Sequence, residues 1–226
     1  MVIWKGINLE NKGIIVEKTP QISKGKKRID TYEIAGRSGF LTIDNGTYDA
    51  FVVSCECHFD NDRSNWDDIK EFLDGYGTLS FDGLKEYTAI IQNAISFEKI
   101  KNFKKFIIQF LVNPIAEDIN STSVSVDYDE YTLNISDATA NMYPVIEITA
   151  TEQETLGITV NNKTFYLYDI DGKYILDCKE KVITHNGTNA SNHMKYDFPY
   201  LVSGENIIEY TGTIDEFKIT YKKAYL

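Results

Sequence analysis

Residues that would carry catalysis or bind a metal are scarce in this chain. Among its 226 residues there are three cysteines and three histidines, and they do not occur at the spacings of a zinc site. The sequence contains no serine or cysteine nucleophile motif and no glycine-rich phosphate loop. It therefore predicts a protein that is not an enzyme and that needs no cofactor or resident metal.

Basic charge is also scarce. The chain holds 23 lysines and arginines against 34 aspartates and glutamates, a net charge of −11, whereas a nucleic-acid binder needs a basic surface that neutralises phosphates. The acidic excess is confined to one half, because residues 1–115 carry 15 basic and 16 acidic side chains and residues 116–226 carry 8 and 18. We infer no specific nucleic-acid binding, and a domain boundary between the two halves.

Long apolar runs are absent. No stretch approaches the roughly 18 residues of a membrane-spanning helix, and the opening residues Met1–Gly6 lack the apolar run of a signal peptide. We expect a soluble protein that is made in a cytoplasm and has no membrane contact. The odd number of cysteines in such a product indicates free thiols, not a disulfide framework.

Aromatic residues, by contrast, are abundant, with 15 tyrosines and 12 phenylalanines. These side chains favour half-buried strands, and strict alternation from Phe51 to Phe59 predicts a strand with one face on a core. Together they predict a mainly β protein. Further strands are predicted at 14–16, 31–34, 40–43, 78–81, 87–91 and 106–112, where Asn113-Pro114 ends the last one, and then at 123–127, 131–135, 144–150, 156–160, 163–168, 174–177, 181–184, 206–210 and 216–221.

One helix is predicted, over residues 64–75. Ser64 is placed to cap its start, two aspartates lie in its first turn, where the helix dipole favours acids, and Gly75 ends it. The residues that build its apolar face are Trp66, Ile69, Phe72 and Leu73.

Turn signals complete the predicted organisation. Hairpin turns are predicted at Asp44-Asn45-Gly46, at Asn161-Asn162 and at Asp169–Gly172, and a glycine-bracketed turn at Ala35–Gly39. Closely spaced strands with such turns between them indicate a sandwich or barrel in the second half. The predicted domains are residues 1–115, a β domain with the helix, and residues 116–226, a β-sandwich.

Three polar clusters contain residue types found in metal or catalytic sites, and for each a structural role is the simpler interpretation. Cys55-x-Cys57-His58 has the residue types of a zinc site, but strand alternation turns His58 away from the cysteines, so core packing is favoured. Asp169-x-Asp171-Gly172 begins like a calcium loop whose later ligands are out of register, so a hairpin turn is favoured. The cluster of Asp60, Asp62, Asp67 and Asp68 is more simply a solvated helix end than a catalytic carboxylate pair.

The one basic run is Lys24-Gly25-Lys26-Lys27-Arg28. It is either a solvated loop or an arm that docks on an acidic neighbouring subunit. In the second case Lys24, Lys26, Lys27 and Arg28 are the inter-subunit contacts.

The order of features over nearly the full length resembles the distal tail protein family of siphophages, which are hub components of the tail tip. No single motif is specific, but their order is. The matching segments are Trp4–Asn8, the Gly-Arg-x-Gly element in Ala35–Gly39, Gly77–Phe81, Tyr87–Ile90 and Phe110–Pro114, followed by Tyr143–Ile148, Ile158–Asn162, Ile175–Cys178 and, as the closest match, Phe198–Leu201 with Gly204–Asn206. On this resemblance Gly36, Arg37, Gly39, Phe198, Pro199, Gly204 and Asn206 are turn and core positions.

The resemblance implies an N-terminal split-barrel-like domain that builds a six-fold ring and a C-terminal galectin-like β-sandwich at the periphery. It implies a structural hub at the virion tail tip that joins the tail tube to the tail-associated fibre or lysin protein and lets DNA pass. Tape-measure and receptor-binding proteins are further expected partners. The chain departs from the family at its end, Lys222–Leu226, where basic and Trp residues are usual, and it is too short to contain an inserted carbohydrate-binding module.

The alternative function is a carbohydrate-binding sandwich that contributes to attachment to the host cell wall. Tyr166, Tyr168, Tyr196 and Tyr200 would form its aromatic platform. Alternation places Tyr166 and Tyr168 on one face of a strand and leaves open whether that face is core. A cell-wall hydrolase is disfavoured, because the catalytic residues are missing.

Overall fold

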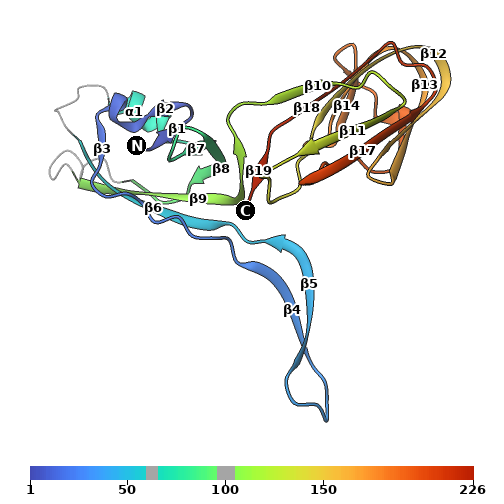
Figure 1. The fold of residues 1–226 in the computed structure, drawn as a ribbon. Helices are drawn as coiled ribbons and strands as arrows, with labels where there is room; N and C mark the ends of the chain where they lie inside the picture. The colour runs from blue at the N-terminus through green and yellow to red at the C-terminus, as the bar shows by residue number, and fades with distance from the viewer. Residues whose placement is uncertain (60–65, 96–104) are drawn as a thin grey trace. The chain divides into compact units, whose positions relative to one another are not determined.

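The chain folds into two compact units of β-structure. The computed structural model describes residues 1–59, 66–95 and 105–226, and it divides them into a first unit, Met1–Ala116 with Leu226, and a second unit, Glu117–Tyr225. The mainly β prediction is confirmed, and each unit has its own sheet (Figure 1). Within the described residues, no helix is both long and apolar enough to cross a bilayer.

The first unit is organised around one curled sheet with the strand order β2-β1-β7-β8-β9-β6-β3. Strand β19 (Ala224–Tyr225) also pairs with β9, whose last two residues belong to the second unit. The elements are β1 (Ile3–Trp4), β2 (Ile7–Asn8), the 3₁₀ helix η1 (Leu9–Lys12), β3 (Ile14–Val16), β6 (Phe51–Phe59), the helix α1 (Trp66–Phe72), β7 (Tyr76–Ser80), β8 (Lys85–Ile91) and β9 (Lys105–Asp118).

Alternation along β6 and β9 produces the core of the first unit. These strands pair antiparallel with Cys55 opposite Ile108, and alternate side chains are buried from Val53 to Phe59 and from Ile108 to Val112. Trp4 lies at the centre of the core, fully buried, with its ring 5.1 Å from that of Phe110. Its indole Nε1–H donates to the carbonyl of Phe72 at 2.9 Å, so this one side chain ties β1 to the end of α1.

The helix is shorter at its end than predicted. It ends at Phe72, after which Gly75 adopts a positive φ of 72°, the left-handed conformation that glycine accepts without strain. Ile69, Phe72 and Leu73 are buried, which confirms that part of the apolar face. The predicted cap, Ser64, lies outside the described residues.

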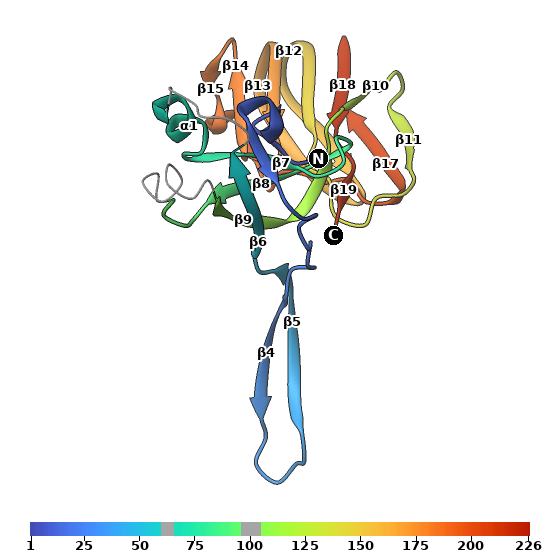
Figure 2. The ribbon, with the colours of Figure 1, turned by 90° about the vertical axis from the view of Figure 1, so that its left-hand side faces the viewer.

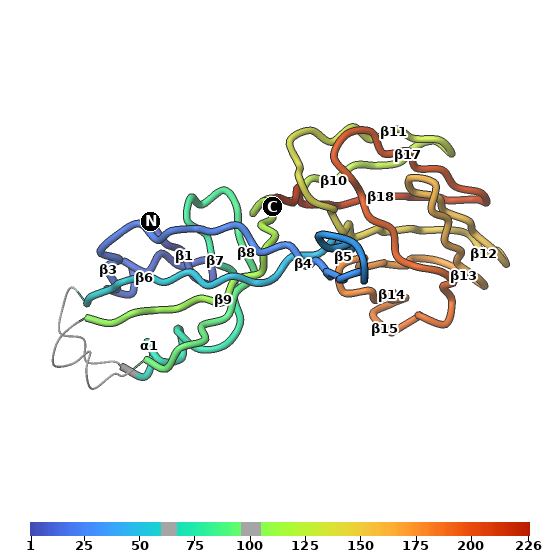
Figure 3. Tube along the Cα trace, turned by 90° about the horizontal axis from the view of Figure 1, so that it is seen from below, coloured from blue at the N-terminus to red at the C-terminus, as the bar shows by residue number. Residues whose placement is uncertain are grey.

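The second unit is a nine-stranded sheet folded into two layers that share one long hairpin (Figure 3). The first part of β12 pairs with β18 and its last part with β17, while β13 pairs with β16 near its start and with β14 near its end. The elements are β10 (Thr122–Ser125), β11 (Glu130–Ile135), β12 (Val145–Val160), β13 (Lys163–Asp177), β14 (Val182–His185), β15 (Thr188–Asn189), η2 (Ser191–His193), β16 (Met194–Lys195), β17 (Gly204–Thr211) and β18 (Glu216–Tyr221).

Turn predictions succeed only in part. Asn161 and Asn162 connect β12 to β13 with φ angles of 51° and 64°, so the predicted hairpin turn is confirmed. The prediction of a hairpin turn at Asp169–Gly172 is wrong, because β13 continues through these residues. The chain there has a register shift in the pairing of β13 with β12, between Ala150 and Gln153. The predicted strands 144–150 and 156–160 are therefore one long strand, β12. The predicted strands 163–168 and 174–177 are likewise one long strand, β13.

Two further boundaries differ from prediction. Asn113-Pro114 does not end β9, which continues to Asp118; the ladder with β6 stops at Val112, and a proline is tolerated where no neighbouring strand needs its N–H. Asp44-Asn45-Gly46 is not a hairpin turn, because these residues lie inside β5 (Phe40–Tyr48).

We predict that Trp4→Phe destabilises the first unit by about 2–3 kcal/mol, since it opens a cavity and leaves the Phe72 carbonyl without its donor. Urea denaturation followed by far-UV circular dichroism measures the change. Tyr76→Phe, at a side chain that is 75% exposed, is the matched control and should unfold like the wild type. Equal midpoints for the two variants would contradict this account of the core.

Candidate functional site

A two-stranded ribbon, here called the arm, is the most unusual feature of the first unit. Strands β4 (Lys27–Glu33) and β5 (Phe40–Tyr48) form a separate sheet of two strands. Figures 1 and 2 show it projecting from the point where β6 begins. Every residue of β4, and every residue of β5 except Tyr48, is exposed to solvent.

Glycines set the geometry of the arm. The predicted turn at Ala35–Gly39 forms its tip, where Gly36 and Gly39 have φ angles of 78° and 86° that favour glycine. Arg37 stands between them, and its amide donates to the carbonyl of Ile34 at 3.1 Å. The Asn45-Gly46 pair makes a bulge in β5, because the register shifts between the pairs Lys27–Tyr48 and Ile29–Asp44.

The arm carries apolar side chains that no described part of the chain covers. Tyr32 and Leu41 are cross-strand partners on one face, which also bears Ile43; Phe40, on the other face, is 63% exposed. A large exposed apolar surface on a soluble protein marks an interaction site. The large apolar side chains exposed on the arm are Ile29, Tyr32, Ile34, Phe40, Leu41 and Ile43.

Sequence reasoning missed these residues. Their signal was present, because two runs of alternating residues flank the glycine turn. Alternation, however, assigns one face to a core by default, and only the structure reveals that, among the residues it describes, these strands pair with each other and with no third strand.

The predicted basic residues lie at the base of the arm. Lys24 and Lys27 place their ammonium groups 5.4 Å and 6.0 Å from the centre of the Tyr48 ring. Lys27 is ion-paired with Asp44, and it lowers the pKa of that carboxyl. Arg28 Nε donates to Asp49 Oδ1 at 2.6 Å. These charges therefore have partners within their own chain, and contact of Lys24, Lys26, Lys27 and Arg28 with a second copy stays a prediction.

Backbone packing also fixes the base. The amide of Asp49 donates to the carbonyl of Lys26 at 2.7 Å. A Cβ atom on Gly25 would lie 2.6 Å from the carbonyl oxygen of Asp49 and 2.7 Å from Cβ of Pro114. Only glycine fits there, so the arm leaves the first unit from a well-packed joint.

In the second unit, Asn206 is a buried connector. Its Oδ1 accepts hydrogen bonds from the amide of Val202 and from Nδ2 of Asn161, both at 2.8 Å. Its Nδ2 donates to the carbonyls of Val202, Gly204 and Leu133 at 2.9–3.3 Å. One fully buried side chain thus joins β17, β11 and the turn between β12 and β13.

The other predicted positions of the closing segment lie just before Asn206 in the chain. Gly204 has a φ of 95°, which requires glycine, and Pro199 is buried beside the half-buried Phe198. Leu201, fully buried, exchanges two backbone hydrogen bonds with Met142. We keep Phe198, Pro199, Gly204 and Asn206 as fold-forming positions.

The cysteines are core residues. Cys55 and Cys57 are buried on the inner face of β6, as predicted, while His58 points outward, with Nδ1 3.3 Å from a carboxylate oxygen of Glu17. Burial raises the pKa of Cys55 to about 11 and those of Cys57 and Cys178 to about 12. Among the described residues, no group of three or more histidine, cysteine or acidic side chains is arranged to hold a metal ion.

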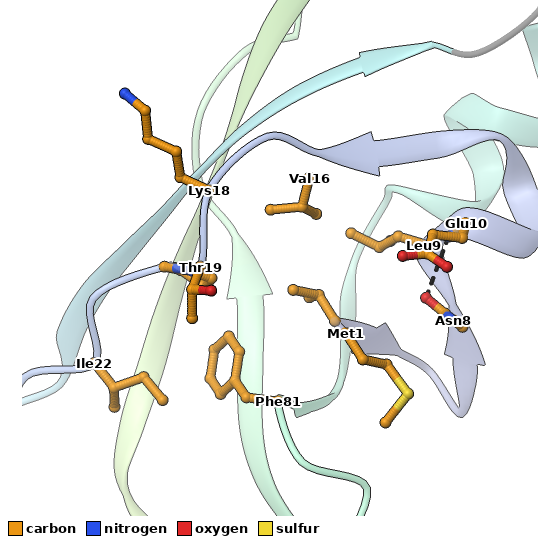
Figure 4. A pocket seen from close by; sticks show the side chains of 11 residues that line it. Met1, Asn8, Leu9, Glu10, Val16, Lys18, Thr19, Ile22 and Phe81 are labelled. Carbon is orange, nitrogen blue, oxygen red and sulfur yellow. Dashed lines mark hydrogen bonds between the residues drawn. The ribbon is translucent and has the colours of Figure 1, made fainter.

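A pocket in the first unit is too small for a typical ligand. Figure 4 shows Phe81 and Ile22 at one side and Asn8 with Glu10 at the other. Its volume is about 120 Å³, whereas small-molecule sites usually measure some 300–1,000 Å³. A larger open groove, of about 470 Å³, lies between residues 18–23 and the outer faces of β6 and β9.

Residues 137–225 match the family model described as siphovirus-type tail component, C-terminal domain. The chain is similar to the crystal structure of the Dit protein of phage SPP1, described as a paradigm of the hub adsorption apparatus in phages infecting Gram-positive bacteria. The TM-score is 0.74 at 13% identity, over 100% of this chain and 98% of that one. No curated protein sequence matches.

We predict that Asn206→Ala destabilises the second unit by about 3 kcal/mol or more, because it leaves several buried polar groups without partners. Thermal unfolding measures the effect. Asn134→Ala, at an exposed position of the neighbouring strand β11, should leave the transition unchanged. A loss below about 0.5 kcal/mol for Asn206→Ala would show that the network is dispensable.

We predict that the three cysteines resist alkylation in the folded protein. Since burial raises the pKa of each thiol, the reactive thiolate is nearly absent at pH 8. Mass spectrometry after iodoacetamide treatment should find no adduct under native conditions and three adducts in 6 M guanidinium. Rapid native labelling of Cys55 or Cys178 would refute the burial.

Proposed function

We propose that this chain is a member of the siphophage distal tail protein (Dit) family and builds a closed ring of identical copies at the hub of a phage tail tip. Its second unit matches the family model and its whole length has the Dit fold, which supports the hub role. The observation that carries the ring is the arm, whose apolar side chains need a partner.

The arm favours a head-to-tail contact between copies. A two-stranded hairpin alone is at best marginally stable in water, so its order depends on a surface that it can cover. In such a contact the arm of one copy binds an acceptor surface, distinct from the arm, on the next copy. Each copy then uses its arm to bind one neighbour and its acceptor surface to bind the other. Such heterologous contacts close into a ring when the rotation between neighbours fits. We take six as the number of copies from the family resemblance.

The open groove beside β6 and β9 is our candidate acceptor. Val52 and Ile107 are exposed on the outer faces of these strands and line the groove. They are the apolar counterpart of Tyr32, Leu41 and Ile43 on one face of the arm. Ser54 and Gln109 add hydrogen-bonding groups between them, as in an interface with an apolar centre and polar surroundings.

The ring would join the tail tube to the tail-associated fibre or lysin protein and let DNA pass. A neutral or acidic lumen would repel phosphates and keep the DNA from adhering. The acidic half of the chain, residues 116–226, supplies a surface for other tail components such as receptor-binding proteins. No described residue group requires a catalytic role, and the proposed function is structural.

The ring is tested by disrupting one face of the arm. The wild type should have a mass of six times the 25.8 kDa of one chain in light scattering, and Leu41→Asp with Ile43→Asp should reduce it to that of a monomer, because charged side chains cannot be buried unpaired. Thr31→Asp, on the opposite face of the same ribbon, is the matched control. A ring that survives the double substitution would exclude this face as the contact.

The acceptor is tested by complementation. Ile107→Asp alone should also give monomers. Mixing it with the arm variant should give dimers and nothing larger, because each pair then has one intact arm and one intact groove. Rings formed by Ile107→Asp alone would place the acceptor elsewhere, with circular dichroism as the control for folding.

A further inference from the structure

Three tyrosines form a row on the outer face of the second unit, and neither the core nor the ring uses them. Tyr166 and Tyr168 lie in β13, where the inward side chains are Phe165 and Leu167. The face of β13 that bears Tyr166 and Tyr168, which the sequence could not assign to core or solvent, is therefore the solvent face. The rings of Tyr166 and Tyr168 are 6.3 Å apart and 30° from parallel, and the ring of Tyr196 is 6.0 Å from that of Tyr166. We call these three the tyrosine platform.

The fourth predicted tyrosine belongs to another group. Tyr200 lies 6.3 Å from the ring of Tyr143, and Lys163 places its ammonium 4.4 Å from the Tyr200 ring centre and 3.1 Å from its hydroxyl. Its ring packs near Tyr143 rather than near Tyr166, and its hydroxyl is already engaged by Lys163. It is not part of the platform.

Polar side chains surround the platform on the same face of the sheet. Directly opposite residues in paired strands point to the same side, so Lys195 lies beside Tyr166 and Thr155 beside Tyr168. On its other side Tyr166 is paired with Gly157 of β12. Gly157 is in turn paired with Thr211 of β17. The next row of directly paired residues on this face crosses β11, β17, β12 and β13. It consists of Glu130, Glu209, Thr159 and Thr164.

The local structure holds the rings in place. Gly157 lies beneath the Tyr166 ring, and a Cβ there would come within 3.2 Å of that ring and 2.7 Å of Thr211 Oγ1. The Nδ1–H of His193 donates to the carbonyl of Tyr168 at 2.7 Å, which fixes η2 and β16 against β13. Tyr196 is 63% exposed and has a φ of 79°, a strained value for a bulky residue. Such strain persists where the surroundings impose it, often at binding sites.

We propose that the tyrosine platform binds a polysaccharide. The C–H face of a sugar ring stacks on an aromatic ring, while its hydroxyls need donors and acceptors at the ring's edge. The platform offers the rings, and threonine hydroxyls, the Lys195 ammonium and the Glu209 carboxylate offer the partners. An open, flat face suits a chain of sugars and does not enclose a small molecule.

A protein partner fits this surface less well. Protein interfaces have a continuous apolar centre from which charges are depleted. Here the rings are bordered by Lys195, threonines and carboxylates, and no large aliphatic side chain is exposed among the residues paired beside them. The platform adds a binding activity to the structural role of the ring.

The test is co-sedimentation of the full chain with bacterial cell-wall sacculi from a panel of Gram-positive species, before and after acid extraction of their wall polysaccharide. We expect retention on at least one intact preparation and its loss after extraction. Tyr166→Ala and Tyr196→Ala should each weaken binding about tenfold, since each removes one stacking face. Tyr128→Ala, at a side chain that is 71% exposed elsewhere in the second unit, should bind like the wild type.

Two further measurements separate the explanations. Gly157→Ala keeps all three tyrosines but displaces the Tyr166 ring, and it should weaken binding while the circular dichroism spectrum stays unchanged. The arm variant, which cannot form a ring, should still bind through single platforms. The proposal is overturned if no preparation retains the wild type, if extracted walls retain it equally, or if the tyrosine variants change only its mass in light scattering.

Discussion

An isolated two-stranded ribbon cannot satisfy its own backbone or bury its own side chains, and this constraint governs the first unit. In a larger sheet, each inner strand has neighbours on both edges and a layer on at least one face. Within the described part of the chain the arm has neither, yet its sequence is as rich in β-branched and aromatic residues as a core strand. In the proposed ring its partner is a second copy of the chain, because an exposed apolar ribbon is stabilised when another surface covers it.

The base of the arm determines what its tip can reach. Charge pairs between Lys27 and Asp44 and between Arg28 and Asp49 are exposed, and solvent screens such exposed pairs so that they add little to stability. The stiffer element is the joint at Gly25, where backbone and Pro114 leave no room for a side chain. The basic run lies at this joint, and its contact with a second copy stays a prediction; in the proposed ring the apolar strands beyond it would make the contact.

Much of the fold was predictable from local pattern, but the turns were less so. Alternation located β6 and β18 at their observed bounds, because a half-buried strand leaves a period of two in the sequence. Asn45-Gly46 and Asp169–Gly172 were misread as turns, since bulges and hairpin turns both need positive φ angles and draw on the same residues. Only the partner strand distinguishes them. Alternation likewise placed Tyr166 and Phe165 on opposite faces of their strand. It did not show which of these two side chains is buried against the second layer.

The two candidate surfaces follow different physics, and together they explain how a weak contact could serve attachment. In the proposed ring the arm buries its apolar side chains against a neighbouring copy, so its order would depend on assembly. The tyrosine platform is built on paired strands and is already ordered, so a ligand pays little conformational entropy to bind it. A flat stacking site gives modest affinity for each copy. A closed ring would present one such site per subunit to the same wall, and the effective concentration of the second and later contacts would then supply the strength that a single platform lacks.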